Sequence, residues 1–189
     1  MTSNVGSAES DEASKRAPVV PRAERSIVLT ADDVKRLLQL EPLPTEGGWF
    51  HETYRSALRM YTAAGERHAS TAIYYLLTSD DVSTMHRLPG EEVFHFYLGD
   101  PVEMLQLHPG GRSNLVVIGN ELAGGMQPQV VVPGGVWQGS RLRAGGKFAL
   151  MGTTMSPGFD PRDYETGARV ALLASHPDAR DLIVALTHS

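Results

Sequence analysis

The stretch that decides the fold runs from Ser83 to Gly99 and has the sequence STMHRLPGEEVFHFYLG. Pro89-Gly90 is a turn signal, and the segments on both sides of it are candidate strands. Residues two apart in a strand share a face, so His86 points the same way as Leu88. Glu92 begins the returning strand. The stretch therefore predicts a hairpin that sets an imidazole opposite a carboxylate.

Short runs of the same kind continue outward from this stretch, between residue 49 and about residue 155. Turn signals such as Gly99-Asp100-Pro101 and Pro133-Gly134-Gly135 separate the runs. Many short strands at such spacing are typical of an all-β sandwich or barrel. The predicted strands cover residues 49–56, 71–78, 82–88, 92–98, 101–108, 113–119, 129–132, 136–142 and 147–155.

Helices are expected on both sides of this β region. Thr30 is a suitable N-cap for a helix that Pro42 would end. Two further helices are predicted over residues 168–174 and 178–187, covering the outside of the barrel. Residues 1–26 have no aromatic side chain and are rich in Ser, Ala and Glu, so they are predicted to be a disordered tail. Residues 27–189 are predicted to form one domain.

Composition narrows the possible functions. The chain has 189 residues, no cysteine and a formal net charge of −5. The absence of cysteine excludes disulfides, thiolate metal sites and a Cys nucleophile. The acidic balance argues against a nucleic-acid partner, and no apolar run reaches the roughly 20 residues of a membrane span. We therefore expect a cytoplasmic protein without nucleic-acid or membrane partners.

Two motifs resemble those of the cupins. In Ser83–Gly99, His86 takes the place of the first histidine of the first cupin motif, Glu92 takes the place of its glutamate, and Leu88 replaces the second histidine. The segment from Pro133 to Gln138 resembles the end of the second motif, with the amide in place of a histidine. Of the usual set of three histidines and one glutamate, the chain keeps one of each.

The replacement of two cupin histidines affects which cofactor is expected. Transition metals favour imidazole ligands, and an amide oxygen is a poor substitute. No cofactor is therefore expected. If a divalent metal is bound, His86, Glu92 and His95 are the candidate ligands. Simple alternation sets His95 on the opposite face from Glu92, although a bulge could turn it inward.

Further segments resemble one cupin family, long catalogued as a domain of unknown function. They are PTEGGWFHETYRS (44–56), STAIYYLL (70–77), EEVFHFYLG (91–99), the block from 128 to 138, and SPGFD (156–160). The resemblance implies a jelly-roll barrel, commonly a homodimer, related in shape to the nucleotide-sugar 3,5-epimerases. It also implies that Leu88 and Gln138 belong to the family's own pattern.

His86 and Glu92 are the predicted catalytic residues. Imidazole titrates near neutral pH, and a carboxylate in a partly apolar barrel has a raised pKa unless a charged histidine stands beside it. The competing interpretation is a structural histidine and a buried ion pair. Glu46, before Gly47-Gly48, is most simply part of a turn, and Arg87 is expected in a surface ion pair.

The predicted substrate-binding residues are those whose alternation or chemistry suits a barrel mouth. Gln138 offers an amide donor and acceptor, and aromatic side chains sharing the alternation of Glu92 would line a cavity. The set is Gln138, His95, Glu52, Phe94, Phe96 and Tyr74.

Three functions are compatible with these residues. The first is a metal-independent enzyme, an isomerase, epimerase, cyclase or dehydratase that moves protons on a small polar or carbonyl-bearing molecule. The second is a non-catalytic module that binds a small molecule. The third is a metal-dependent cupin enzyme.

Overall fold

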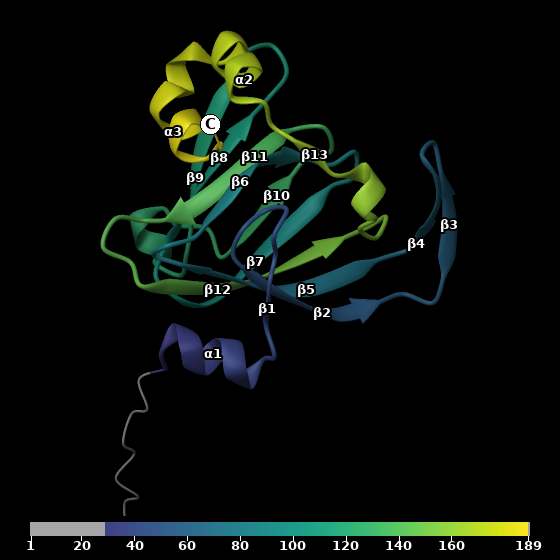
Figure 1. Cartoon of the computed structure of the whole chain (residues 1–189), viewed down its shortest axis with the longest axis horizontal. Helices are drawn as coiled ribbons and strands as arrows, with labels where there is room; N and C mark the ends of the chain where they lie inside the picture. The colour runs from purple at the N-terminus through teal and green to yellow at the C-terminus, as the bar shows by residue number, and fades with distance from the viewer. Residues whose placement is uncertain (1–28, 189) are drawn as a thin grey trace, which may run out of the picture.

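Two facing β-sheets build the molecule, and a separate hairpin projects from one end of them (Figure 1). The computed structural model describes residues 29–188. The predicted tail, residues 1–26, and the first residues of the predicted domain lie outside this range. The all-β jelly-roll fold with helices at both ends, predicted above, is confirmed.

The two sheets account for eleven strands. In spatial order the larger sheet contains β1 (Glu41–Pro42), β2 (Trp49–Arg55), β5 (Thr71–Thr78), β12 (Phe148–Met155), β7 (Glu92–Gly99) and β10 (Gln129–Val132). The smaller sheet contains β13 (Glu165–Thr166), β6 (Val82–Arg87), β11 (Trp137–Leu142), β8 (Val102–Leu107) and β9 (Ser113–Ile118). The projecting hairpin is β3 (Arg59–Thr62) with β4 (Gly65–His68).

Helices cover the outer faces, as Figure 1 shows. Helix α1 (Ala31–Leu37) packs on the larger sheet through Val34, against Leu76 and Leu150. Helices α2 (Arg169–Ser175) and α3 (Arg180–Ala185) pack on the smaller sheet. Three short 3₁₀ turns complete the described elements: η1 (Leu122–Gly124), η2 (Pro161–Asp163) and η3 (Pro177–Ala179).

The main core lies between the sheets. Phe94, Met104 and Met151 are almost fully buried there, and they come from β7, β8 and β12. Burying such side chains stabilises a fold by about 1.5–3 kcal/mol each. Because this core occupies one part of the space between the sheets, polar side chains gather where it ends.

The nine predicted strands are all present, each within one residue of its predicted limits. The hairpin β3–β4 was not predicted, because its residues are mostly exposed and show no apolar alternation. The short strands β1 and β13 were also missed. Thr30 caps α1 in a capping box with Asp33. The helix ends at Leu37 rather than at Pro42.

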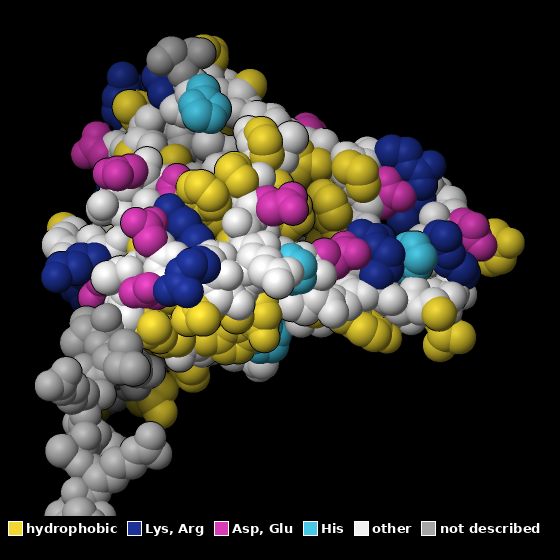
Figure 2. Space-filling view, turned by 60° about the horizontal axis from the view of Figure 1, so that its bottom comes forward, with side chains coloured by type: hydrophobic (Ala, Val, Ile, Leu, Met, Phe, Trp, Pro, Cys, Tyr) yellow, Lys and Arg dark blue, Asp and Glu magenta, His cyan; other side chains and the backbone are white. Residues whose placement is uncertain are grey.

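The surface carries mixed charge. On the face shown in Figure 2, basic and acidic side chains are interspersed rather than gathered into one basic area. No helix within residues 29–188 is both long enough and apolar enough to span a bilayer.

Candidate functional site

A cavity of about 280 Å³ opens between the two sheets, at the end where the main core stops. Its walls combine carboxylates with apolar side chains from the larger sheet, from Leu88 directly after β6 and from the segment after β12. The lining includes Leu43, Glu46, Phe50, Glu52, Arg55, Ile73, Leu88, Glu92, Thr153, Met155 and Phe159. We call this the mouth cavity.

Ser83–Gly99 reaches the mouth cavity by crossing from one sheet to the other. β6 pairs with β11 and β13, whereas β7 pairs with β10 and β12, so β6 and β7 do not form the predicted hairpin. Pro89-Gly90 instead lies in the connection between the sheets. His86 and Glu92 therefore belong to opposite walls of the interior.

Gln138 connects these walls. It is the register partner of His86 on β11, and its Nε2 donates a hydrogen bond to Glu92 Oε2 at 2.6 Å. All three side chains are buried. The structure thus brings together the three residues predicted from the cupin motifs. The Oε1 atom of Gln138 is buried and has no partner among the described residues. A buried acceptor normally has a hydrogen-bond partner.

Glu46 joins the site, although its sequence context predicted only a turn. Its Oε1 accepts a hydrogen bond from Ser83 Oγ at 2.6 Å, and its Oε2 lies 3.9 Å from His86 Nε2. Its backbone carbonyl accepts from the amide of Thr84 at 2.8 Å. Gly47, with φ of 100°, turns the chain so that the carboxylate points inward. The pair Gly47-Gly48 directly after Glu46 was the feature of the sequence that could have indicated this inward position of the carboxylate.

The imidazole of His86 is held in one orientation. Its Nδ1 lies 2.7 Å from the carbonyl oxygen of Thr84, and its ring stacks on Tyr164 with centroids 5.0 Å apart. A carbonyl can only accept, so Nδ1 carries the hydrogen. In the neutral ring Nε2 is then the basic atom, and it faces Glu46. Tyr164 was not singled out from the sequence.

Burial raises the pKa of Glu92 above its ordinary value, and the neighbouring charge of Glu46 raises it further. The charge of His86 and the hydrogen bond from Gln138 act in the opposite direction. Burial and Glu46 likewise raise the pKa of Tyr164. Two carboxylates that share one interior with an imidazole are arranged to hold and release a proton.

Replacing Glu92 by glutamine is expected to stabilise the fold increasingly as pH rises. Because folding raises this pKa, the folded chain holds the proton more tightly than the unfolded chain. The contribution of Glu92 to stability is therefore full below the ordinary pKa of 4.5 and is lost as pH rises through the higher folded value. Urea unfolding of both proteins between about pH 4 and pH 8 measures the difference. A difference independent of pH would contradict this assignment.

Glu52 lies at the rim of the mouth cavity and is paired with Arg55. The guanidinium donates from Nε to Glu52 Oε1 at 2.8 Å and from Nη1 to the carbonyl oxygen of Phe159 at 3.2 Å. Since both groups are partnered, Arg55 is not a free cation at the rim. Arg87 lies outside the cavity in the predicted surface ion pair, 2.7 Å from Glu165.

Of the six predicted substrate-binding residues, Glu52 lines the mouth cavity, Gln138 is connected to it through its hydrogen bond to Glu92, and four lie away from it. His95 contacts Gln129 at 3.2 Å and Thr154 at 3.3 Å on the outer side of the larger sheet. Tyr74 is on that outer side as well and packs edge-to-face on Tyr97. Phe94 and Phe96 share the inward face but belong to the main core. These four are not part of the lining of the mouth cavity, because alternation gives a face and not a depth. That they contact a ligand stays a prediction.

The residues present do not fit a transition metal. The positions of two cupin histidines hold Leu88 and Gln138, and His95 points to the other side of the sheet. Among residues 29–188, no three His, Cys, Asp or Glu side chains are placed to hold a metal ion. The set His86, Glu92 and His95, considered above, is not brought together.

Comparison with known proteins matches residues 32–167 to the family model described as Cupin superfamily (DUF985). A hypothetical protein from Leishmania major shares 32% identity, with a TM-score of 0.79, over 85% of this chain and 100% of that one. Protein SO0799 from Shewanella oneidensis shares 34% identity, with a TM-score of 0.77, over 85% and 98%.

A curated relative is the uncharacterized protein YML079W of Saccharomyces cerevisiae, 31% identical over 133 residues. The match covers 63% of this chain and 66% of the yeast protein, slightly under two thirds of its length. All the residues that line the mouth cavity lie in the region matched by the family model. The cupin motifs of the sequence follow one another along the chain in the order of the strands described above. The chain belongs to the cupin superfamily, in the family catalogued as DUF985.

Proposed function

We propose that the chain is a metal-independent enzyme that moves protons on a small polar or carbonyl-bearing molecule. Isomerisation, epimerisation, cyclisation and dehydration are the reactions of this class. One observation carries the proposal: a buried carboxylate with a raised pKa, Glu92, lies across the interior from an oriented imidazole, His86.

Each group has a definite part in such a reaction. His86 Nε2 is the base, because Nδ1 is committed to the Thr84 carbonyl. Glu46 Oε2, 3.9 Å away, stabilises the imidazolium that forms when Nε2 takes a proton. Protonated Glu92 is the acid for a substrate oxygen. Gln138 Oε1 accepts a hydrogen bond from a substrate hydroxyl or N–H group.

Proton transfer can be measured before the natural substrate is known. Small hydroxy-carbonyl compounds are incubated with the protein in D₂O, and NMR detects deuterium entering at carbon. His86→Ala and Glu92→Gln are each expected to slow the exchange by about 10²- to 10⁴-fold. Arg87→Gln removes a surface ion pair with Glu165 and a contact with the Trp137 ring, both outside the mouth cavity, so it is the control and should leave the rate unchanged. Full exchange in both site variants would refute the proposal.

A non-catalytic binding module is the second candidate, favoured by the unpaired acceptor of Gln138. If the chain is such a module, the compounds bind and Gln138→Leu weakens their binding, but no deuterium enters at carbon.

Self-association and a cytoplasmic location stay predictions. Tyr54, Tyr97 and Val131, each about half exposed on the outer side of the larger sheet, are the residues we propose for contact with a second copy.

A further inference from the structure

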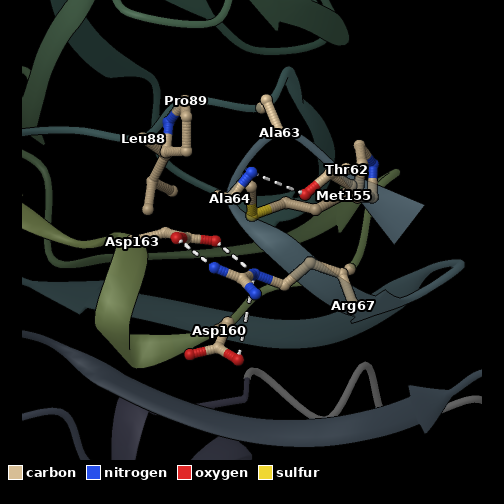
Figure 3. Close-up of a pocket in the computed structure, with 12 residues that line it drawn as sticks. Thr62, Ala63, Ala64, Arg67, Leu88, Pro89, Met155, Asp160 and Asp163 are labelled. Atoms are coloured by element: carbon tan, nitrogen blue, oxygen red, sulfur yellow. Dashed lines mark hydrogen bonds and ion pairs between the residues drawn. The ribbon is translucent and has the colours of Figure 1, made fainter. Parts of the chain in front are cut away.

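A second cavity of about 220 Å³ lies beside the mouth cavity, beneath the projecting hairpin (Figure 3). The hairpin closes it with Thr62, Ala63 and Ala64. The segments 88–90 and 155–163 form the rest of its wall. Apart from Thr62 and one charged cluster, this lining is apolar. We call it the hairpin cavity.

The charged cluster in the hairpin cavity is internally neutralised. Arg67 is only 5% exposed and donates two hydrogen bonds to Asp163, at 2.7 and 2.6 Å, and a third to the carbonyl oxygen of Glu66. Asp160 lies 3.9 Å from Arg67 and is bound by Arg162 at 2.6 Å. Two arginines therefore balance two aspartates. Such a cluster anchors the hairpin, and it leaves no free charge to bind a phosphate or carboxylate.

The two cavities share part of their walls. Leu88 and Met155 line both, and both side chains are buried. Figure 3 shows them on two sides of the hairpin cavity, with Arg67 below. A methionine has three rotatable bonds and adapts readily to a neighbouring group. These two apolar side chains are therefore the residues at which the two cavities adjoin.

We propose that the two cavities form one bipartite site and that the ligand is a small amphiphile. Its polar head lies in the mouth cavity, and its apolar tail passes Leu88 and Met155 to lie beneath the hairpin. The head is neutral or cationic, because the mouth cavity holds the carboxylate of Glu46 while its one arginine is already paired with Glu52. This inference rests on the proposed function only for the placement of the head.

A series of straight-chain primary amines, from ethylamine to octylamine, tests the proposal. Their ammonium group complements the carboxylates of the mouth cavity, and calorimetry gives each affinity. In the wild-type protein, each added methylene that reaches the hairpin cavity is expected to raise affinity by about fourfold. The gain stops once the cavity is filled.

Ala64→Phe fills the hairpin cavity from an exposed turn, so the fold is kept. It should abolish the increase in affinity with chain length for the long amines and leave the affinity for ethylamine unchanged. Ala57→Phe is the matched control, since Ala57 is equally exposed and lines neither cavity. It should keep the wild-type dependence on length.

Measuring the same series with His86→Ala separates this inference from the proposed function. The length dependence should persist in that variant even though proton transfer is lost. Affinities that do not vary with chain length in the wild type, or a gain that survives Ala64→Phe, would overturn the bipartite site. Neither result would bear on the deuterium exchange.

Discussion

The double variant Leu88→His, Gln138→His is expected to bind one divalent transition metal per chain with a Kd below about 1 µM, where the wild-type chain binds far more weakly. Both positions adjoin the residues that would complete the set. Gln138 is the register partner of His86 and hydrogen-bonds Glu92, and Leu88 lines the same cavity as Glu92. Three imidazoles and a carboxylate would then converge.

The existing contacts of His86 favour this result. Its Nδ1–H donates to the Thr84 carbonyl, which leaves Nε2 as a ligand and supplies the second-shell hydrogen bond that metal-bound histidines usually have. Cobalt(II) absorption in the visible range and metal content after dialysis measure binding. Each single variant is a control and should bind at least about tenfold more weakly. A double variant that binds no more cobalt than the wild type would mean that these four positions do not converge.

Gly47→Ala is expected to lower the free energy of unfolding by at least about 3 kcal/mol. With φ at 100°, Gly47 has a backbone conformation that other residues rarely adopt, and an added Cβ would lie 2.2 Å from the carbonyl oxygen of Val82. The clash is with backbone, so no side chain can move to relieve it. The turn that points Glu46 at His86 would be displaced, and Tyr75 would lose the carbonyl to which its hydroxyl donates.

Gly145→Ala is the matched control for this prediction. Gly145 also has a positive φ, of 88°, but nothing lies within 4 Å of the Cβ that alanine would add. Its substitution should cost only the backbone strain, about 1–2 kcal/mol. Urea unfolding of the three proteins gives the comparison. If Gly47→Ala destabilises no more than Gly145→Ala, the close approach to Val82 does not constrain the turn.

Local patterns predicted the strands well because alternation and turn residues act over a few positions. The segment 71–78 matches β5 at both ends, and 129–132 matches β10. The connection at Pro89-Gly90 was predicted as a turn, which is correct, but as the turn of a hairpin, which is wrong. A turn signal marks where a strand ends and does not say which sheet the next strand joins.

The candidate site was predicted in part for the same reason. His86, Glu92 and Gln138 were found because the cupin motifs fix their spacing along the chain, and the structure brings them together. Glu46 was missed because its position depends on contacts with Ser83 and Thr84, nearly forty residues away. His95 was left open by the possibility of a bulge, and its bonds to neighbouring strands keep it on the outer side.

By itself, the sequence determined the all-β fold and the family, and it singled out His86, Glu92 and Gln138 as one group, since these follow from short-range periodicity and motif spacing. Only the tertiary structure decided that Ser83–Gly99 spans two sheets, that Glu46 lies beside His86, and that Leu88 lines two cavities. These features are set by packing between segments distant in the chain, where distances depend on how whole sheets face one another. The stretch Ser83–Gly99 therefore contributes residues to opposite walls of the site, but the distance between those walls is set by how the two sheets pack.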